Sequence, residues 1–507
     1  MLENKITGSL FYRVFNYKYF FRIILFIFIF EALWIALSSA YPMGFDEDFH
    51  LGIIRLFASH ISPFWAHQPR NADVFGAIAR DPSYLYQYLM SFIYRLITLF
   101  TSNQSVIVII LRFINIGLVA WGLVLFRKLL LKTKASISKI NFSLLIFILL
   151  PVFPLLAAQI NYDNLFFPLT ALTFILTINL ADKIFAKKFD TLLLFQIIIL
   201  CILTSLVKYA FLPIALIVFL YLIFEINKNI KIKNCISLIK NDLQKLSYLK
   251  KAYLLIILIL SIGLFSQRYA VNLVKYHTVI PDCSRVLSIK ECSVYGPWIR
   301  DYNFKINKID TEIGTEKNLI TYSADWFYGM WLRTYFSVSG PALNYQSRGP
   351  MPIPSISGIF FACLGLIATI FTFKKILNKY NSHHILFLLL ACFFYVAVLW
   401  LDEFKAFRET GQPVAINGRY VFPVILPLIL ILVIGTSIAL AKYQKLKMFL
   451  AVVCLLCLIW GGGLLTFILR SNDVWYFNSR LVRNINHAVQ RTIGPISPGF
   501  STPGEFL

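Results

Sequence analysis

An acidic cluster of Asp46, Glu47 and Asp48 follows the first long apolar stretch of the chain, and His50 comes one helical turn after Asp46. If this segment is helical, Asp46 and His50 lie on one face of the helix. Carboxylates in the first turn of a helix are favoured by its dipole, and they can act as a base or bind a cation. A solvated acidic N-cap has the same residue pattern, so both interpretations stay open.

The composition indicates that this cluster belongs to a membrane protein. Of the 507 residues, 58% are hydrophobic and 14% are charged, a balance too apolar for a soluble domain. The net charge of +24 could suggest nucleic acid binding. The basic residues, however, lie in short clusters between apolar stretches, where they mark topology and contact anionic lipid. We therefore expect an all-α polytopic membrane protein with membrane lipids, and no nucleic acid, as partners.

Eleven apolar stretches are long enough, at about 20 residues each, to cross a bilayer. A further stretch, 83–101, is ambiguous. If it lies along the surface, all six basic linkers, including 127–139 and the seven-lysine linker 228–251, fall in the cytoplasm as the positive-inside rule requires. If it crosses, 127–139 and every later basic linker lie outside. We therefore expect a cytoplasmic N-terminus, an extracytoplasmic C-terminus and spans at 20–40, 105–126, 140–158, 164–182, 190–207, 209–226, 252–270, 356–374, 383–401, 419–440 and 447–469.

Two long outer segments follow from this topology. The residues after Asp46 form an apolar stripe that suits a helix lying on the bilayer, so we expect surface-lying helices in the first outer loop. The second segment is a small outer cap with one cysteine pair, Cys283 and Cys292, for which a disulfide and two free thiols both stay open. The expected organisation is a transmembrane module over 1–270 with the outer loop 41–104, the cap over 271–354, C-terminal transmembrane helices over 355–470 and an extracytoplasmic tail over 471–507.

The same topology gathers further ionisable residues on the outer face. Asp163 lies in the short outer link 159–164, where a helix N-cap is the plain alternative. Lys208 and Arg419 lie at outer ends of spans, where the alternatives are a tight turn for Lys208 and snorkelling to headgroups for Arg419. Acids beside bases suggest an anionic substrate from which a proton is removed. Further candidates for substrate contact are His50, Arg55, Arg80, Tyr84, Tyr209 and Tyr420.

The order of these motifs resembles the GT-C class of integral membrane glycosyltransferases, which includes protein O-mannosyltransferases and bacterial aminoarabinose transferases. FDEDFH (45–50) and NYDN (161–164) match its two acidic motifs, and VKYAFLP (207–213) resembles the Lys-Tyr segment of the mannosyltransferases. GRYVFP (418–423) is similar to an element of uncharacterised bacterial membrane proteins that share the Asp-Glu-x-x-His opening. The resemblance covers the chain to about residue 226 and then only GRYVFP, and no segment matches an acceptor-binding domain.

The resemblance implies a sugar donor linked to polyprenyl phosphate, reached from within the bilayer, and a glycan, lipid or protein acceptor that arrives from outside. By carry-over, Asp46 is the general base, with Glu47 assisting or positioning it. Asp163 is the second acid, and Lys208 contacts the lipid phosphate. Direct displacement would invert the anomeric carbon. In oligosaccharyltransferase-like relatives an Asp-x-Asp pair, here Asp46 and Asp48, goes with a divalent metal, and no other cofactor is implied.

The expected location is a bacterial plasma (inner) membrane, with the endoplasmic reticulum left open. Two other functional classes also stay open. A polysaccharide polymerase or ligase takes lipid-linked sugar too, and would depend on cap arginines such as Arg300 and Arg333 more than on Asp46. A lipid-linked glycan transporter would use intramembrane charges such as Glu31 and Arg112, and would have inverted repeats with broken helices in matching halves, which the sequence does not show.

Overall fold

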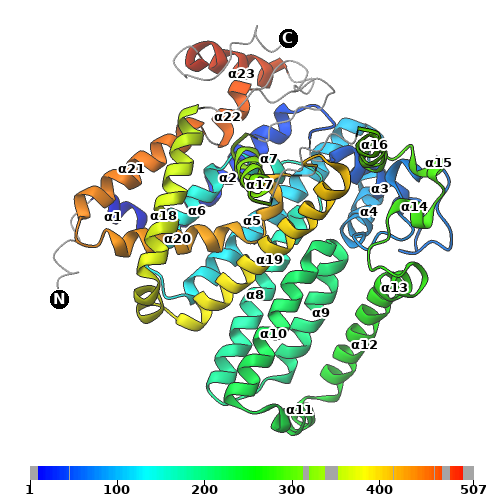
Figure 1. The fold of residues 1–507 in the computed structure, drawn as a ribbon, viewed down its shortest axis with the longest axis horizontal. Helices are drawn as coiled ribbons and strands as arrows, with labels where there is room; N and C mark the ends of the chain where they lie inside the picture. The colour runs from blue at the N-terminus through cyan, green and yellow to red at the C-terminus, as the bar shows by residue number, and fades with distance from the viewer. Residues whose placement is uncertain are drawn as a thin grey trace.

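The computed structural model describes residues 10–44, 46–311, 319–336, 352–414, 416–461, 463–470 and 480–494, and its regular elements are helices (Figure 1). Within these residues, seven helices are long and apolar enough to cross a membrane. This agrees with the all-α polytopic membrane fold expected from composition. The seven are α2 (Phe20–Ser38), α5 (Gln104–Lys132), α8 (Asp163–Phe185), η3 with α10 (Tyr209–Asn229), α12 continuing through α13 (Tyr248–Tyr276), α18 (Pro352–Lys379) and α19 (Ser382–Thr410).

The other four expected spans each contain one shorter helix or two successive described helices. The interruption within 140–158 has a local cause, since Pro151 lacks the N–H that a helix needs and Leu150 before it is extended. Two single helices have 17 and 15 residues. The four are α6 (Ile137–Leu149) with α7 (Val152–Ala157), α9 (Thr191–Val207), α20 (Ile425–Ala439), and α21 (Gln444–Gly461) with α22 (Gly463–Arg470).

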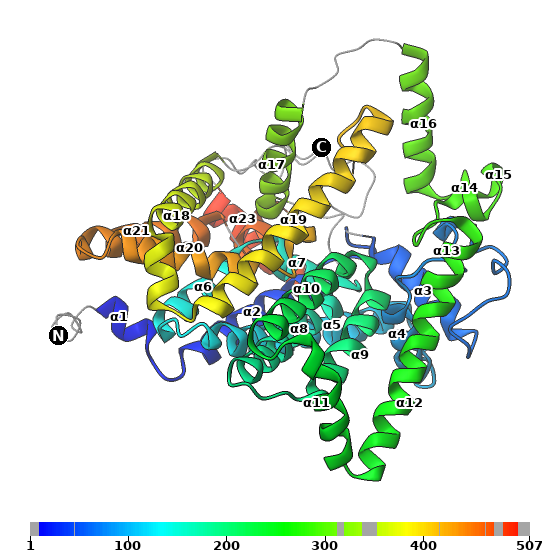
Figure 2. The ribbon, with the colours of Figure 1, turned by 60° about the horizontal axis from the view of Figure 1, so that its bottom comes forward.

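The ambiguous stretch 83–101 forms α4 (Leu85–Thr98), whose 14 residues are too few to cross a hydrocarbon core of about 30 Å. α4 lies beside α3 (Glu47–Ala58), as both ribbon views show (Figures 1 and 2). Arg95 of α4 donates hydrogen bonds to the carbonyls of Phe57 and Ala58, which satisfies backbone groups that the end of α3 leaves open. The two helices therefore form one paired unit within the first loop.

Several basic linkers expected in the cytoplasm meet on one face of the bundle. The Asn381 N–H, after α18, donates to the carbonyl of Thr133, after α5. His384, at the start of α19, lies 2.7 Å from the Asp182 carboxylate near the end of α8. The junctions after α5, α8 and α18 therefore share a face, and α8 leads from it to the opposite face, where Asp163 lies.

An aromatic stack holds the segment 418–423 against the bundle. Phe422 directly follows η5 (Gly418–Val421), and its ring stacks with those of Phe153 and Phe167, with centroid distances of 5.3 and 4.2 Å. Phe147 stacks on the same group, 5.9 Å from Phe422. The buried rings fix the position of Arg419 and Tyr420 in η5.

Part of the expected cap is described, with 312–318 and 337–351 outside the described residues. The described helices α16 and α17 stand out from the apolar bundle on one side (Figure 2). A disulfide joins Cys283 to Cys292. Of the expected tail, 480–494 is described, and α23 (Arg480–Ile493) contacts α2 through a 2.9 Å hydrogen bond from Trp34 to Asn486. The cap helices are α14 (Cys283–Val286), α15 (Ile289–Cys292), α16 (Gly296–Thr311) and α17 (Leu319–Phe336).

Candidate active site

Asp46 presents an exposed carboxylate at the start of α3. Its backbone is left-handed, with φ of 66°, a conformation that Asp tolerates better than most residues. Oδ2 accepts a 2.7 Å hydrogen bond from Arg419 Nη2, and 57% of the side chain stays exposed. Partial desolvation raises the pKa of Asp46, but the charge and hydrogen bond of Arg419 outweigh it, so this pKa lies below its usual value. Asp46 is therefore ionised and accessible near neutral pH.

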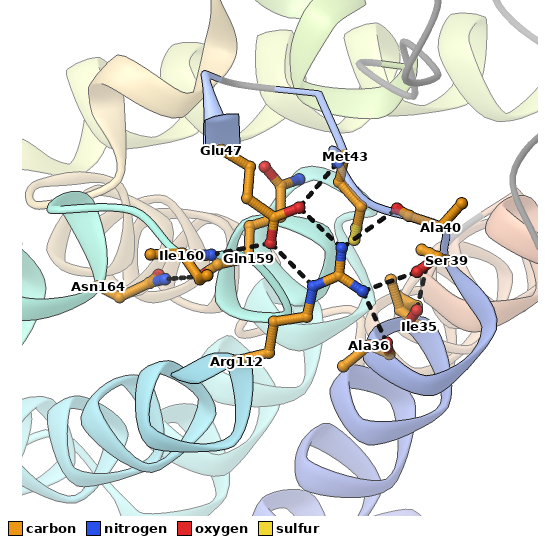
Figure 3. A network of polar contacts seen from close by, with 10 residues as sticks. All are labelled: Ile35, Ala36, Ser39, Ala40, Met43, Glu47, Arg112, Gln159, Ile160 and Asn164. Carbon is orange, nitrogen blue, oxygen red and sulfur yellow. Dashed lines mark hydrogen bonds and ion pairs between the residues drawn. The ribbon is translucent and has the colours of Figure 1, made fainter. Parts of the chain in front are cut away.

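Glu47, in contrast to Asp46, has a fully buried side chain, which points toward Arg112 (Figure 3). Its carboxylate forms a two-point ion pair with Arg112, with distances of 2.8 Å from Nε and 2.7 Å from Nη2. The same two oxygens accept the backbone N–H groups of Ile160 and Met43, at 3.3 and 2.7 Å. Of the two roles considered for Glu47, this geometry supports positioning and leaves no open oxygen for assisting a proton transfer.

Arg112 extends this network to the end of α2 (Figure 3). Its guanidinium donates to the carbonyls of Ala36 and Ser39, at 2.9 and 2.7 Å. Carbonyls at a helix end lack partners within the helix, so the arginine satisfies them. The Glu47–Arg112 pair thereby joins the end of α2, the start of α3, the middle of α5 and the link before α8, and holds Asp46 in place.

Lys208 and Asp163 form a second, buried ion pair. Lys208 lies between α9 and η3, and its Nζ donates to Asp163 Oδ1 at 2.5 Å, with the two side chains 6% and 2% exposed. Nζ also lies 4.7 Å from the Tyr162 ring centroid and 5.2 Å from that of Tyr420. An ammonium has three donors. Since this is its one hydrogen bond among the described residues, and Asp163 Oδ2 is buried without a partner there, the pair can still bind a polar ligand.

The η5 segment brings the two ion pairs together. The Asn417 side chain caps η5 by accepting the Arg419 N–H at 3.0 Å, and the neighbouring Tyr420 faces Lys208. The Arg419 side chain carries a positive charge, because a guanidinium is not deprotonated in proteins. We call Asp46, Asp163, Lys208 and Arg419 the polar cluster.

His50 is buried beside the polar cluster and is neutral. Burial lowers its pKa to about 3. The Gln87 amide lies 3.1 Å from His50 Nδ1. Both ends of the Gln87 amide are satisfied when its oxygen accepts from Nδ1–H and its nitrogen donates to the carbonyls of Ser83 and Tyr84. The edge-on Tyr162 ring lies 4.6 Å away. The histidine therefore links α3 to α4 as a neutral group, and contributes no positive charge to a substrate.

Two candidate residues, Tyr84 and Arg80, lie outside the polar cluster. They surround a buried arginine, Arg268, that was not among the residues expected from the sequence. Arg268 lies 4.6 Å from the ring centroid of Tyr84, and it donates to the carbonyl of Ala79. The Arg80 carbonyl accepts a hydrogen bond from Asn272, one turn after Arg268. The structure therefore places Tyr84 and Arg80 in a contact between the first loop and the segment after α12, where Arg268 and Asn272 lie. An arginine at the end of an apolar stretch was the available signal, because buried charges there are rare.

Tyr209 lies next to Lys208, and its N–H donates to the Ser83 hydroxyl at 3.0 Å. Its side chain is 38% exposed, so it borders the polar cluster and stays open to a ligand. Arg55 is an exposed residue of α3, in the last turn.

The residues around Asp46 do not fit a divalent metal. Among the described residues, no group of three or more His, Cys, Asp or Glu side chains is arranged to hold a metal ion. Asp46 already binds a guanidinium, and Asp48 is an exposed side chain of the same turn. Calcium and magnesium need six or more oxygen ligands, of which the protein normally supplies several.

A cavity of about 300 Å³ opens beside the polar cluster. Arg300 of α16 and Arg333 of α17 line it together with Asn417 and Tyr420. Tyr420 thus lines the cavity, and the Lys208 ammonium lies over its ring.

No protein-family model, curated protein or solved structure matches this chain. The function must therefore be inferred from the side chains. They provide an accessible carboxylate that can take a proton, and two cations that can stabilise an anionic leaving group, at the ends of apolar helices.

Proposed function

We propose that this chain is a membrane glycosyltransferase of the GT-C kind. It would move a sugar from a polyprenyl-phosphate donor to an acceptor hydroxyl on the outer face of the plasma membrane. The observation that carries the proposal is the polar cluster, in which the exposed carboxylate of Asp46 lies beside the buried Lys208–Asp163 pair. The remaining four apolar segments, α6 with α7, α9, α20, and α21 with α22, would complete eleven spans.

The donor phosphate would bind at Lys208 and Arg419. Lys208 keeps two N–H donors beyond its bond to Asp163 among the described residues, and a phosphate oxygen accepts such donors strongly. Lys208 lies where α9 ends and η3 begins, so an anionic headgroup at this depth would leave its lipid chain among apolar helices. Cations held there before the reaction stabilise the negative charge that develops on the departing phosphate.

Asp46 would accept the proton of the acceptor hydroxyl. As the acceptor oxygen bonds to the anomeric carbon, the bond from that carbon to the phosphate oxygen breaks, and its electron pair leaves with polyprenyl phosphate. The hydroxyl becomes strongly acidic as the new bond forms, so a carboxylate with a lowered pKa is basic enough. Attack opposite the leaving group inverts the anomeric carbon.

The test is release of polyprenyl phosphate by the purified full-length protein from a panel of polyprenyl-phosphate sugars. Asp46→Asn keeps the size of the side chain and removes the base, so turnover should fall by about 10²- to 10⁴-fold. Asp48→Asn is the matched control, since Asp48 is exposed in the same helical turn. Both variants should melt like the parent protein. Unchanged turnover in Asp46→Asn would remove Asp46 from the mechanism.

A polysaccharide polymerase or ligase is the second candidate, because Arg300 and Arg333 line a cavity beside the polar cluster. Such an enzyme would need these arginines for transfer itself. Comparing Arg300→Ala with Asp46→Ala in one glycan assay separates the two functions, since the larger loss identifies the group nearer the chemistry. A transporter is less well supported, because Arg112 is fixed by Glu47 and by backbone carbonyls.

A further inference from the structure

The cavity beside Tyr420 brings together two arginines from different helices. Arg300 donates from Nε to Asp301 at 2.7 Å, and its side chain is 45% exposed, so the Nη groups remain for a ligand. For Arg333, no carboxylate lies within ion-pair distance in the part of the chain that the structure describes. The cavity therefore carries positive charge that its own walls leave incompletely balanced.

The position of the cavity indicates which substrate reaches it. Arg300 and Arg333 come from α16 and α17, which stand out from the apolar bundle (Figure 2). A water-soluble group can approach there, whereas a lipid-linked phosphate arrives among the apolar helices near Lys208. Tyr420 contacts both places, with its ring 5.2 Å from Lys208 Nζ. The two regions are therefore neighbours with different access.

Building on the proposed glycosyl transfer, we propose that this cavity is the acceptor subsite and binds an acidic group of the acceptor, a phosphate or carboxylate, between Arg300 and Arg333. A guanidinium forms paired hydrogen bonds with such oxyanions, and two of them define where the acceptor lies. A volume of about 300 Å³ is at the lower end of ligand pockets, enough for an acidic group with part of its sugar. The neighbouring hydroxyl of the acceptor would then face Asp46.

The probe is inorganic phosphate, titrated calorimetrically into the full-length protein that is already saturated with polyprenyl phosphate. We expect phosphate to bind without displacing the lipid. In Arg300→Gln/Arg333→Gln, phosphate affinity should fall by roughly tenfold or more, because two charge-assisted contacts are lost, while lipid affinity stays the same. Arg70→Gln is the matched control, since Arg70 is an exposed arginine of the first outer loop, and it should bind phosphate like the parent.

Three results would overturn the acceptor subsite: unchanged phosphate affinity in the double variant, competition between phosphate and polyprenyl phosphate, or weaker lipid binding in the double variant. Weaker lipid binding in the double variant would assign the cavity to a second phosphate of the donor. Arg333→Lys keeps the positive charge but loses the planar guanidinium. Its phosphate affinity should therefore lie between those of the parent protein and the double variant. The proposed function fails separately, if Lys208→Met binds polyprenyl phosphate as tightly as the parent protein does.

Discussion

Asp46 and Glu47 are adjacent carboxylates in opposite environments. A buried ion pair loses several kcal/mol of hydration per ion, and this loss is offset only when the remaining polar atoms are hydrogen-bonded. Glu47 meets that condition with Arg112 and two backbone N–H groups, while Asp46 keeps more than half of its surface exposed. The buried carboxylate of Glu47 therefore fixes the position of the accessible carboxylate of Asp46.

Glu47→Gln should destabilise the folded protein strongly. The amide keeps the side chain's volume but leaves the Arg112 charge buried without a counterion, which costs about 3–5 kcal/mol. Asp190→Asn, which breaks the more exposed Lys183–Asp190 pair, is the control and should cost less than about 1 kcal/mol. Unfolding of both variants in detergent measures the difference. Equal losses would show that burial of the Glu47 pair is not decisive.

Arg419 should set the acid limit of activity through Asp46. The pKa of Asp46 lies below its usual value, so the carboxylate is ionised above that pH, and activity is lost only as pH falls through the lowered pKa. Arg419→Gln removes the strongest attraction that lowers the pKa of Asp46, so desolvation raises this pKa and the acid limb of kcat/KM should move to higher pH. Profiles of both proteins against pH measure this shift. An acid limb near neutral pH in the parent protein would contradict the assignment.

The residue types of the polar cluster could be read from the sequence, but their pairing could not. Topology and motif order place Asp163, Lys208 and Arg419 on the face of Asp46. Which acid meets which base depends on tertiary contacts, since Asp46 and Arg419 are 373 positions apart. Arg112 illustrates the same point, because its partner is Glu47, the first residue of α3, whereas the sequence analysis named it together with Glu31 of α2.

At the scale of elements, η5 and α17 approach so closely that only glycine fits between them. A Cβ on Gly418 would lie 2.5 Å from the backbone nitrogen of Thr334 and 2.7 Å from its Cα, where no flexible side chain can move aside. η5 carries Arg419 and Tyr420, and α17 carries Arg333. The fit of these two backbones therefore sets the spacing between the polar cluster and the cavity.

Gly418→Ala should reduce turnover more than it reduces stability. The added methyl forces η5 or α17 to shift, and a displacement of about 1 Å at a catalytic group can cost roughly 100-fold in rate. Gly117→Ala in α5 is the control, because no atom lies within 4 Å of the added Cβ, and the change should stabilise the helix by about 0.5–1 kcal/mol. Turnover and melting temperature test both variants. Parent-like turnover in Gly418→Ala would contradict the role of this contact.

The long helices were predictable because their apolar stretches exceed the thickness of a bilayer, as in α5 with its 29 residues. The shorter elements were harder to predict from the sequence. Pro151 is visible in the sequence, yet proline bends some helices and ends others, and here the neighbouring Leu150 is extended. The Asn417 cap of η5 is local, but the close approach of η5 to Thr334 of α17 is a tertiary contact that no local pattern encodes.

At the scale of the whole molecule, the chain has two distinct faces. α9 begins near α11 (Ile232–Lys245), where Thr191 contacts Asp242, and it ends near Tyr209 and Ser83 of the opposite face. The first face carries basic linkers, and the second carries the polar cluster. The positive-inside rule predicted a face that gathers the basic linkers if 83–101 does not cross, and α4 in that stretch has 14 residues, too few to cross about 30 Å.

Transfer on the outer side requires that the face with the polar cluster lie outside the cell, which thiol labelling can test. Arg70→Cys lies in the first loop, 41–104, and Lys188→Cys lies in the linker between α8 and α9, and both positions are exposed. In intact cells, a membrane-impermeant maleimide should label Arg70→Cys, and it should reach Lys188→Cys only after permeabilisation. The parent protein, with its native cysteines, gives the background. The reverse pattern would place Asp46 in the cytoplasm, where an acceptor from outside could not reach it.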